Sequence, residues 1–329
     1  MRVLAILSRY PQLSETYIST ELRTLWPKHD VSIIGLGSPD LPQANHFPYQ
    51  TIGRHDAARL IEAARGVAPQ VLHTHYLFQA PRMHRVAEAL GVPYTIRTHS
   101  YDILRASPSS LRTWSDLVND ERCLGILVFP FLKARLVEAG MAPSKVHECF
   151  PVVDFDRFYN RAPNTPGVMN VGAALPKKNM EGYLRLATQI RGLPTRLYAI
   201  GYDVARLREL NDELGRPVMI CDTVDPEDMP GEYKRHTWLI YSASRSAGTV
   251  GWPMAVAEAQ AAGVGLCIEG IRPDLRDLVG PGGFLLGRLS DALDIIDEPV
   301  PAAVREAGFE QARRSDVRAH IRVLEALWR

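Results

Sequence analysis

The chain has 329 residues, more than a typical single domain, and this length predicts two domains. Its composition, 46% hydrophobic and 23% charged, is typical of a globular protein with enough apolar material for two cores. A formal net charge of +1 argues against a nucleic-acid partner and against a broad membrane-binding surface.

Neither a membrane span nor a targeting segment is visible in the sequence. No apolar run approaches the roughly 18 residues that a spanning helix requires, and Arg2–Leu7 is typical of a strand rather than a signal peptide. The four cysteines lack the spacing of a metal or redox motif, and we expect buried free thiols in a cytoplasmic protein. They are Cys123, Cys149, Cys221 and Cys267.

The first half of the chain alternates strands and helices. After the strand at 2–8, Ser14 is placed to cap a helix that continues through Ile18 and Leu22 and ends at Pro27. The expected elements that follow are strands at 31–34, 71–75, 93–98, 124–129 and 146–150 and helices at 55–65, 79–90, 110–120 and 130–139. Strands that alternate with helices of this length predict a parallel sheet covered by helices.

The alternation stops at the proline-rich segment 151–166, which we interpret as a linker, and then restarts. The expected elements are strands at 168–171, 195–200, 218–221, 238–241 and 264–268 and helices at 178–191, 203–214, 227–235, 253–263 and 301–329. The fold class is therefore α/β, with domains at 1–155 and 165–300 and a final helical segment at 301–329.

The stretch 249–263 combines a small-residue loop with a helix. Pro253 suits a first helical position, and Gly263 suits the end of the helix. A loop that leads into a helix N-terminus presents unpaired backbone N–H groups, which suit an anion such as a phosphate. An ordinary loop–helix–strand turn of an α/β domain explains the same residues, so the stretch alone does not decide between the two.

Two α/β halves in succession predict two Rossmann-like domains that face each other across a cleft. Ligands of open α/β sheets bind beyond the carboxyl ends of the strands. Neither the Gly-x-Gly-x-x-Gly fingerprint nor a phosphate loop is present, which argues against a nicotinamide enzyme and a P-loop enzyme. The segments expected near the cleft are 8–16, 73–76, 99–102, 172–179, 201–203 and 242–254.

Several segments, in the right order along nearly the whole chain, together resemble glycosyltransferase family 4. No single motif is strong, and the ordered set carries the resemblance. The segments are Pro11-Gln-Leu-Ser-Glu-Thr-Tyr-Ile18, His73-Thr-His75, Gly91-Val-Pro93, Thr98-His-Ser-Tyr-Asp102, Pro151-Val-Val-Asp154, Val171–Asn179 and Thr249–Gly263. The resemblance implies the GT-B fold, in which the last helix crosses back to cover the first domain.

The resemblance also implies an activity. Members of the family transfer a sugar from a nucleotide-activated donor to an acceptor hydroxyl and retain its anomeric configuration, without a cofactor or a metal. The implied partners are a nucleotide sugar and an acceptor saccharide or small molecule. A lipid-linked acceptor would bring peripheral contact with a membrane. A front-face mechanism is implied, and no protein nucleophile is nominated.

Two positions depart from the family pattern at the donor site. Ala173 stands where the family has an arginine, and Val250 stands where it has the first glutamate of its Glu-x7-Glu pair. Lys178 matches the family lysine that neutralises the donor diphosphate, and Glu258 matches the glutamate that holds the ribose hydroxyls. The chain therefore retains the nucleotide end of the site and differs at its phosphate and sugar end.

The predicted donor-binding residues are Lys178, Arg245, Val250, Gly251, Trp252, Pro253, Met254 and Glu258. Arg245, Lys177 or Arg9 could replace the missing cation, because each lies on a loop expected near the cleft. A solvated lysine at 178 and a glutamate exposed on its helix at 258 are the structural alternatives.

On the acceptor side, His99 is the predicted catalytic residue, and the other candidates are Ser14, Glu15, Thr16, His75 and Asp102. A neutral imidazole can bind a sugar hydroxyl without adding charge. Glu15 also has a structural explanation in the first turn of a helix. His73 and His75 form a His-x-His pair, but no carboxylate or cysteine lies at matching spacing, so we predict no metal and expect His73 to pack.

Two other functions fit the same residues. Loss of the arginine and the glutamate could accompany a different donor, such as phosphoribosyl pyrophosphate. Alternatively, a catalytically silent GT-B protein could bind a sugar nucleotide or a partner protein. The presence of His99, Lys178 and Glu258 favours an active enzyme.

Overall fold

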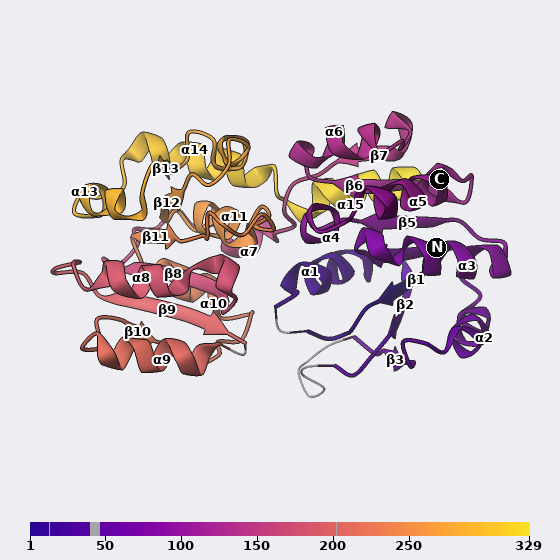
Figure 1. Ribbon diagram of the computed structural model, residues 1–329, viewed down its shortest axis with the longest axis horizontal. Helices are drawn as coiled ribbons and strands as arrows, with labels where there is room; N and C mark the ends of the chain where they lie inside the picture. Colours follow the sequence, from indigo (N-terminus) through magenta and orange to yellow (C-terminus); the bar gives the residue numbers. More distant parts are fainter. Residues whose placement is uncertain (13, 40–46, 202) are drawn as a thin grey trace. The chain divides into compact units, whose positions relative to one another are not determined.

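The computed structural model describes residues 1–12, 14–39, 47–201 and 203–329, which form two compact units. Unit 1 comprises Met1–Val152 and Val317–Arg329, and unit 2 comprises Val153–Asp316 (Figure 1). Leu13 of the Pro11–Ile18 motif, residues 40–46 and Tyr202 of the expected 201–203 segment lie outside the described residues.

Unit 1 is built on a seven-stranded parallel sheet with the order β3-β2-β1-β4-β5-β6-β7. Its strands are β1 (Arg2–Leu7), β2 (Asp30–Gly35), β3 (Gln50–Thr51), β4 (Val71–His75), β5 (Tyr94–Arg97), β6 (Cys123–Val128) and β7 (Val146–Glu148). Its helices are α1 (Thr16–Leu25), α2 (Ala57–Val67), α3 (Ala80–Leu90), α4 (Tyr101–Leu104), α5 (Pro108–Asn119), α6 (Pro130–Glu138) and α15 (Val317–Leu327), with 3-10 turns η1 (Leu77–Gln79) and η2 (Pro143–Lys145).

Unit 2 is built on a six-stranded parallel sheet with the order β10-β9-β8-β11-β12-β13. Its strands are β8 (Val168–Ala173), β9 (Thr195–Ile200), β10 (Met219–Ile220), β11 (Trp238–Tyr241), β12 (Gly265–Glu269) and β13 (Phe284–Leu286). Its helices are α7 (Phe155–Phe158), α8 (Met180–Ala187), α9 (Val204–Glu213), α10 (Met229–Lys234), α11 (Met254–Ala261), α12 (Leu275–Val279), α13 (Leu293–Ile296) and α14 (Ala302–Arg313), with turns η3 (Pro176–Lys178) and η4 (Leu289–Ala292).

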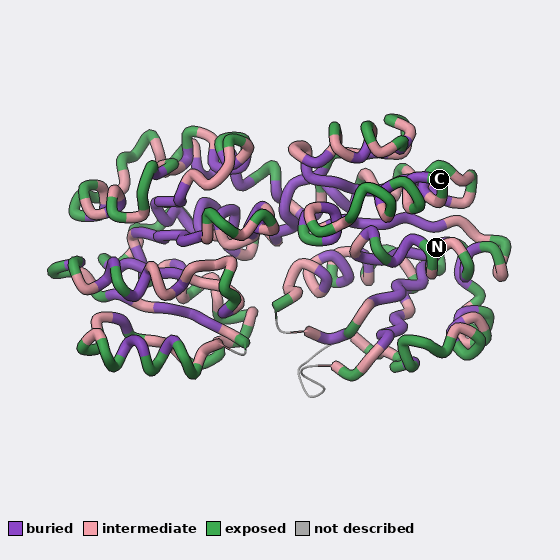
Figure 2. The backbone as a smooth tube through the Cα atoms, in the orientation of Figure 1, coloured by how far each residue is buried: buried purple, intermediate pink, exposed green. Residues whose placement is uncertain are grey.

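Both sheets are covered by helices. In unit 1, α1 buries Ile18, Leu22 and Leu25 at helical spacing and packs against α15. In unit 2, α11 packs against α14 and α7, while α8 packs against α9. The central strands are buried along almost their whole length (Figure 2), as expected for parallel strands covered on both faces.

The predicted α/β class with two parallel-sheet units is confirmed. The expected helical segment 301–329 is instead two helices that belong to different units. The chain returns to unit 1 only at Val317, so α15 belongs to unit 1 (Figure 1), and residues 301–316 belong to unit 2 because α14 packs on α11. The expected linker also belongs to unit 2 from Val153 onward and contains α7.

Three local expectations require correction. Helix α1 begins at Thr16 with Glu15 at its N-cap position, so Ser14 does not cap it. Pro253 occupies the N-cap position of α11 rather than the first helical position. Cys221 is only partly buried, whereas the other three cysteines are buried, and all four are free. No helix in the described part of the chain is long and apolar enough to cross a membrane.

Candidate functional site

Each sheet reverses its strand order at one point, and open α/β sheets bind ligands beyond the carboxyl ends of the strands at such a point. In unit 2 the reversal lies between β8 and β11, and in unit 1 it lies between β1 and β4. The segment around Lys178 follows β8, and His75 is the last residue of β4. The fold thus places predicted residues of both units at reversal points.

The turn that carries Lys178 is tied to the end of β11. The hydroxyl of Ser242 donates a 2.9 Å hydrogen bond to the backbone carbonyl of Lys178. Asn170, in β8, donates a 3.0 Å bond from Nδ2 to the same hydroxyl oxygen. Asn179, directly after the turn, has a φ of 47°. These contacts fix the backbone of Lys178 beside the carboxyl ends of two adjacent strands.

The ammonium group of Lys178 is half-buried and lies over the ring of Tyr241. Its Nζ is 4.7 Å from the ring centroid and donates a hydrogen bond to the Tyr241 hydroxyl. Burial lowers the pKa of Lys178 to about 8. No carboxylate among the described residues forms an ion pair with it. Lys178 is therefore a partly desolvated cation whose charge is not balanced by any carboxylate in the described ranges.

The loop before α11 is held from within unit 2. The backbone carbonyl of Val250 accepts a hydrogen bond from Arg272, and the indole of Trp252 donates a 2.8 Å bond to Oδ2 of Asp274. Arg272 and Asp274 form an ion pair at 2.8 Å. The side chains of Val250 and Trp252 are both buried. These two predicted donor residues therefore support the loop with packed side chains.

The remaining predicted donor residues of this loop lie at the start of α11. Gly251 and Met254 are half-buried, and Pro253 is buried at the N-cap of α11. No side chain caps the N-terminus of α11 among the described residues. Its first backbone N–H groups thus lack a side-chain acceptor, which is the condition for an anion to bind at a helix start.

Arg245 is paired within unit 2. Its Nε lies 3.0 Å from Oε1 of Glu269, and it donates a second bond to the carbonyl of Gly287. The second carboxylate oxygen of Glu269 is buried without a hydrogen-bond partner among the described residues. The sequence reasoning missed Glu269, although an acid that ends an apolar strand was a visible signal. Arg245 was a candidate to replace the missing cation, but its charge is already balanced by Glu269.

Glu258 has a partner on the neighbouring helix. The hydroxyl of Tyr233, in α10, donates a 2.7 Å hydrogen bond to Oε2 of Glu258. Burial raises the pKa of Glu258, and the bond from Tyr233 and the nearby charge of Arg157 oppose that rise. Glu258 is half-buried, so it is neither freely exposed nor buried alone.

At the start of α1, Glu15 and Tyr17 are linked through the hydroxyl of Tyr76, which follows β4. The Tyr76 hydroxyl donates a 2.5 Å bond to Oε1 of Glu15, and it lies 2.5 Å from the hydroxyl of Tyr17. The carboxylate of Glu15 makes no capping bond to α1. Ser14 is exposed, and Thr16 is half-exposed at the first helical position.

Asp102 fastens the loops after β4 and β5 to each other. Its two carboxylate oxygens accept backbone bonds from His99 at 2.9 Å and from Leu77 at 2.6 Å. Burial raises the pKa of Asp102 to about 6, against these backbone bonds. The backbone of Ser100 has a φ of 59°. Asp102 therefore holds the backbone of the predicted catalytic residue, His99, in place.

The imidazole of His99 lies against a second imidazole. Its Nε2 is 2.8 Å from Nδ1 of His75, and the two rings are stacked with their centroids 5.1 Å apart. The rings of Tyr17 and Tyr76 lie 4.3 Å and 4.8 Å from that of His99. His75 is buried, whereas His99 is half-buried.

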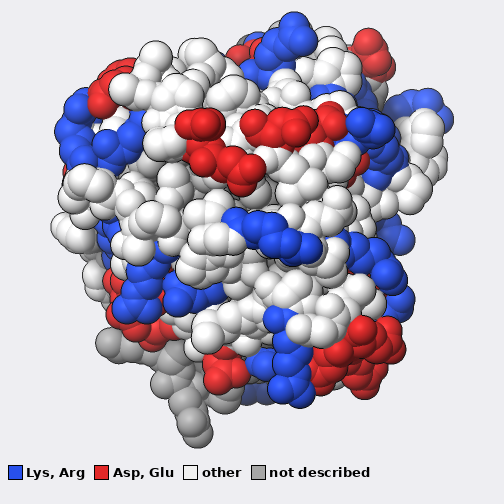
Figure 3. All heavy atoms as spheres, turned by 90° about the vertical axis from the view of Figure 1, so that its left-hand side faces the viewer, with Lys and Arg blue, Asp and Glu red and all other residues white. Residues whose placement is uncertain are grey.

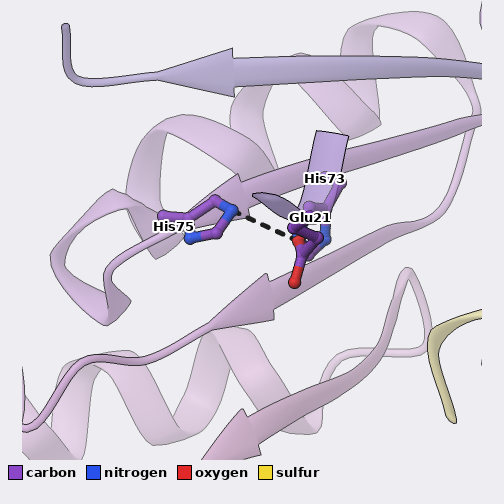
Figure 4. A group of neighbouring side chains, drawn as sticks. All are labelled: Glu21, His73 and His75. Atoms are coloured by element: carbon purple, nitrogen blue, oxygen red, sulfur yellow. Dashed lines mark hydrogen bonds and ion pairs between the residues drawn. The ribbon is translucent and has the colours of Figure 1, made fainter. Parts of the chain in front are cut away.

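Behind His75 lies a buried cluster that the sequence did not reveal. Glu21 of α1 reaches the two histidines of β4 (Figure 4), with Oε1 2.7 Å from Nε2 of His73 and 3.2 Å from Nε2 of His75. Its other oxygen accepts a bond from Arg97 of β5. The expectation that no carboxylate accompanies the His-x-His pair is therefore wrong.

The donor atoms of Glu21, His73 and His75 lie within 4.8 Å of one another, a spacing that could hold a metal ion. Arg97, however, places a cation on the same carboxylate, and two of its nitrogens are buried without hydrogen-bond partners among the described residues. A divalent cation would add positive charge beside that guanidinium. We therefore interpret the group as an ion-paired cluster.

The basic and acidic side chains on the visible face of unit 2 are interspersed (Figure 3). In that view acidic side chains gather in a band near the top and in a cluster at the lower right, with basic side chains between and beside them. A broad surface that attracts a polyanion carries charge of one sign, whereas this face carries both signs.

Comparison with solved structures identifies the fold. No protein family and no curated relative matches the sequence. HepE from Anabaena, solved in complex with UDP-glucose, matches with a TM-score of 0.79 at 14% identity, over 99% of each chain. The chain has the GT-B fold.

Two further GT-B structures match along the whole chain. Sucrose-phosphate synthase from Thermosynechococcus elongatus matches with a TM-score of 0.75 at 12% identity, over 100% of this chain and 98% of that one. A glycosyltransferase from Rickettsia africae matches with a TM-score of 0.69 at 12% identity, over 99% and 98% of the two chains. At these identities the likeness establishes the fold, and function has to be argued from the residues.

Proposed function

We propose that this protein is a glycosyltransferase that moves a sugar from a nucleotide-activated donor to a hydroxyl of a saccharide or small-molecule acceptor. Unit 2 binds the donor, and unit 1 carries the acceptor-side residues. The observation that carries the proposal is Lys178, an uncompensated, half-buried ammonium at the strand reversal of unit 2. A leaving nucleoside diphosphate is the anion that such a cation would stabilise.

The surroundings of Lys178 support a nucleotide donor. HepE, a structural neighbour with the same fold, has been solved in complex with UDP-glucose and with UDP. Here Oε2 of Glu258 accepts a hydrogen bond from Tyr233, and its Oε1 accepts none from the side chains that the structure describes. A carboxylate can accept bonds from two vicinal hydroxyls, such as those of a ribose.

On the acceptor side, we propose that His99 contacts the sugars at the reacting centre and that Glu15 orients the acceptor. The half-buried imidazole of His99 lies beside the rings of Tyr17 and Tyr76. The hydroxyl of Tyr76 donates a hydrogen bond to Glu15. Membership of glycosyltransferase family 4 and retention of anomeric configuration belong to the same proposal. NMR of the first-formed product would show the same anomer as the donor, and an inverted anomer would overturn the retaining assignment.

Binding of UDP, GDP, ADP and phosphoribosyl pyrophosphate to the full chain tests the donor class. We expect a thermal shift with one of the nucleoside diphosphates. A shift with phosphoribosyl pyrophosphate alone would replace the nucleotide-sugar donor by a pentose one. Nucleotide binding without hydrolysis or transfer of the matching sugar nucleotide would indicate a binding protein and contradict catalysis.

Replacement of Lys178 tests the phosphate site. Lys178→Ala removes one charge-assisted contact, worth about 1.5–3 kcal/mol, so we expect the dissociation constant of the nucleoside diphosphate to rise by about 10- to 100-fold. Calorimetric titration measures this change. Arg216→Ala is the control, because Arg216 pairs with Asp212 on an exposed surface of the same unit. Equal affinities of the two variants would refute the assignment.

A further inference from the structure

The two ring nitrogens of His75 face different partners. Nδ1 is 2.8 Å from Nε2 of His99. Nε2 is 3.2 Å from Oε1 of Glu21 (Figure 4). One proton lies between the two imidazoles, because a hydrogen bond between ring nitrogens needs one donor and one acceptor. Which ring supplies that proton depends on the tautomer of His75.

The charge of Glu21 decides that tautomer. Its second oxygen is bonded to the guanidinium of Arg97, and its first oxygen is bonded to His73. Despite the cost of burial, the positive charge of Arg97 keeps the pKa of Glu21 well below its usual range, so Glu21 is an anion. If Nε2 of His75 were unprotonated, its lone pair would face this carboxylate. The N–H of His75 therefore lies on Nε2, and Nδ1 is the acceptor.

We propose that Glu21, acting through His75, holds His99 in the tautomer that is protonated on Nε2, so that Nδ1 of His99 accepts a hydrogen bond from a sugar hydroxyl. Glu21 and His75 are positioning residues that lie behind the residue that touches substrate. The substrate class rests on the proposed function, whereas the tautomer rests on the buried contacts alone. No described residue hydrogen-bonds to Nδ1 of His99, and the side chain is half-buried.

The surroundings keep both imidazoles neutral, which the proposal requires. Burial lowers the pKa of His99 well below its usual range and that of His75 to about 4. The charged or titratable groups that face the pair are Glu21 of α1, His73 of β4, Arg97 of β5, and Tyr17, Tyr76 and Glu15. The backbone bond from His99 to Asp102 holds the backbone of His99 in place. At neutral pH each imidazole thus carries one proton, and the proton of the hydrogen bond between them belongs to His99.

The tautomer can be measured directly on the full chain without a ligand. We expect ¹⁵N NMR of the histidine-labelled protein at pH 7.5 to show His99 protonated on Nε2 and bare on Nδ1. A His99 that is protonated on Nδ1, or that is a charged imidazolium, would overturn the proposal. This measurement on the native sequence does not depend on any variant folding.

Variants at the two strand histidines separate positioning from packing. His75→Phe removes the acceptor, so we expect a mixture of His99 tautomers, whereas His75→Asn keeps an oxygen near the position of Nδ1 and should preserve the Nε2 form. His73→Gln is the matched control, because His73 contacts Glu21 but is not bonded to His99. A His99 signal that is unchanged in His75→Phe contradicts the proposal.

Activity provides a second readout once a donor and acceptor are known. We expect His75→Phe to lower kcat by about 10²-fold, the lower end of a general acid–base contribution, with less change in the donor KM and substantial rescue by His75→Asn. Equal losses in His75→Phe and His73→Gln would mean that the cluster only supports the fold. If the chain binds no sugar nucleotide but the tautomer is as expected, the proposed function fails and the positioning network stands.

Discussion

The ionisable cluster around Glu21 in unit 1 and the ammonium group of Lys178 in unit 2 differ in how their charge is balanced. In unit 1, Glu21, Arg97, His73 and His75 form a closed set in which the one carboxylate contacts the other three groups. In unit 2, Lys178 has a tyrosine but no carboxylate partner among the described residues. The cluster around Glu21 thus balances its charge internally, whereas no described carboxylate balances the charge of Lys178.

This difference indicates what each unit is prepared to bind. A balanced, neutral imidazole such as His99 suits an uncharged hydroxyl, since it can accept a hydrogen bond without a change in charge. An unbalanced cation in a partly desolvated place suits an anion, because its attraction is strengthened where water is excluded. In the function that we propose, the cluster around His99 would receive an acceptor alcohol, and Lys178 would receive a diphosphate.

The largest expected effect comes from breaking the balance in unit 1. Glu21→Leu leaves Arg97 buried without its carboxylate, and loss of one partner of a buried ion pair costs about 3–5 kcal/mol. We expect the free energy of unfolding of unit 1 to fall by that amount, as measured by native-state hydrogen exchange in β4 and β5. The double variant Glu21→Leu/Arg97→Met should recover most of the loss, and a single variant as stable as the native chain would contradict the charge balance.

A smaller effect follows from the unbalanced charge in unit 2. A bound diphosphate raises the pKa of Lys178 above its free value of about 8, so binding takes up a proton above that pH. Affinity is fully present below pH 8 and falls as the pH rises toward 9, by at most about tenfold per pH unit. Calorimetric titration between pH 7.5 and 9 measures this fall. Lys178→Arg should remove it, because a guanidinium stays charged throughout the range.

The smallest effect concerns the partner of Glu258. Tyr233→Phe removes one hydrogen bond, worth about 0.5–1.5 kcal/mol of stability, and raises the pKa of Glu258 further. Because this pKa is already raised, the stability that Glu258 contributes declines as pH rises through it, and more so in the variant. Tyr198→Phe is the control, since Tyr198 donates a similar bond to Glu232. Only Tyr233→Phe should weaken nucleotide binding as well.

The sequence predicted the features that depend on local periodicity. Apolar runs such as 71–75 and 264–268 indicated buried parallel strands, and the structure has β4 at Val71–His75 and β12 at Gly265–Glu269. The order of strands and helices then indicated which loops follow carboxyl ends, and the resemblance to glycosyltransferase family 4 singled out Lys178 and His99 among their residues. Short elements escaped prediction, because α12 and β13 span too few residues to show a period.

The features that depend on contacts between distant segments could not be predicted. Glu21 lies 52 positions from His73 in the sequence, and only folding brings them together. The sequence nonetheless contained a signal, because Glu21 lies on the apolar face of α1. A buried carboxylate is costly unless a cation or a hydrogen-bond donor pairs with it. The pairing of Arg245 with Glu269 likewise required the fold.

The position of α15 sets the order in which this protein can mature during synthesis. Trp328 donates a 3.1 Å bond to the hydroxyl of Thr95, and its ring lies 6.1 Å from that of His73, so the segment after Val317 completes the buried cluster of unit 1. Ribosomes make residues 153–316 before that segment. Unit 2 can therefore fold completely before the last helix of unit 1 has been synthesised. The sheet that is translated first is thus the last to acquire all of its packing partners.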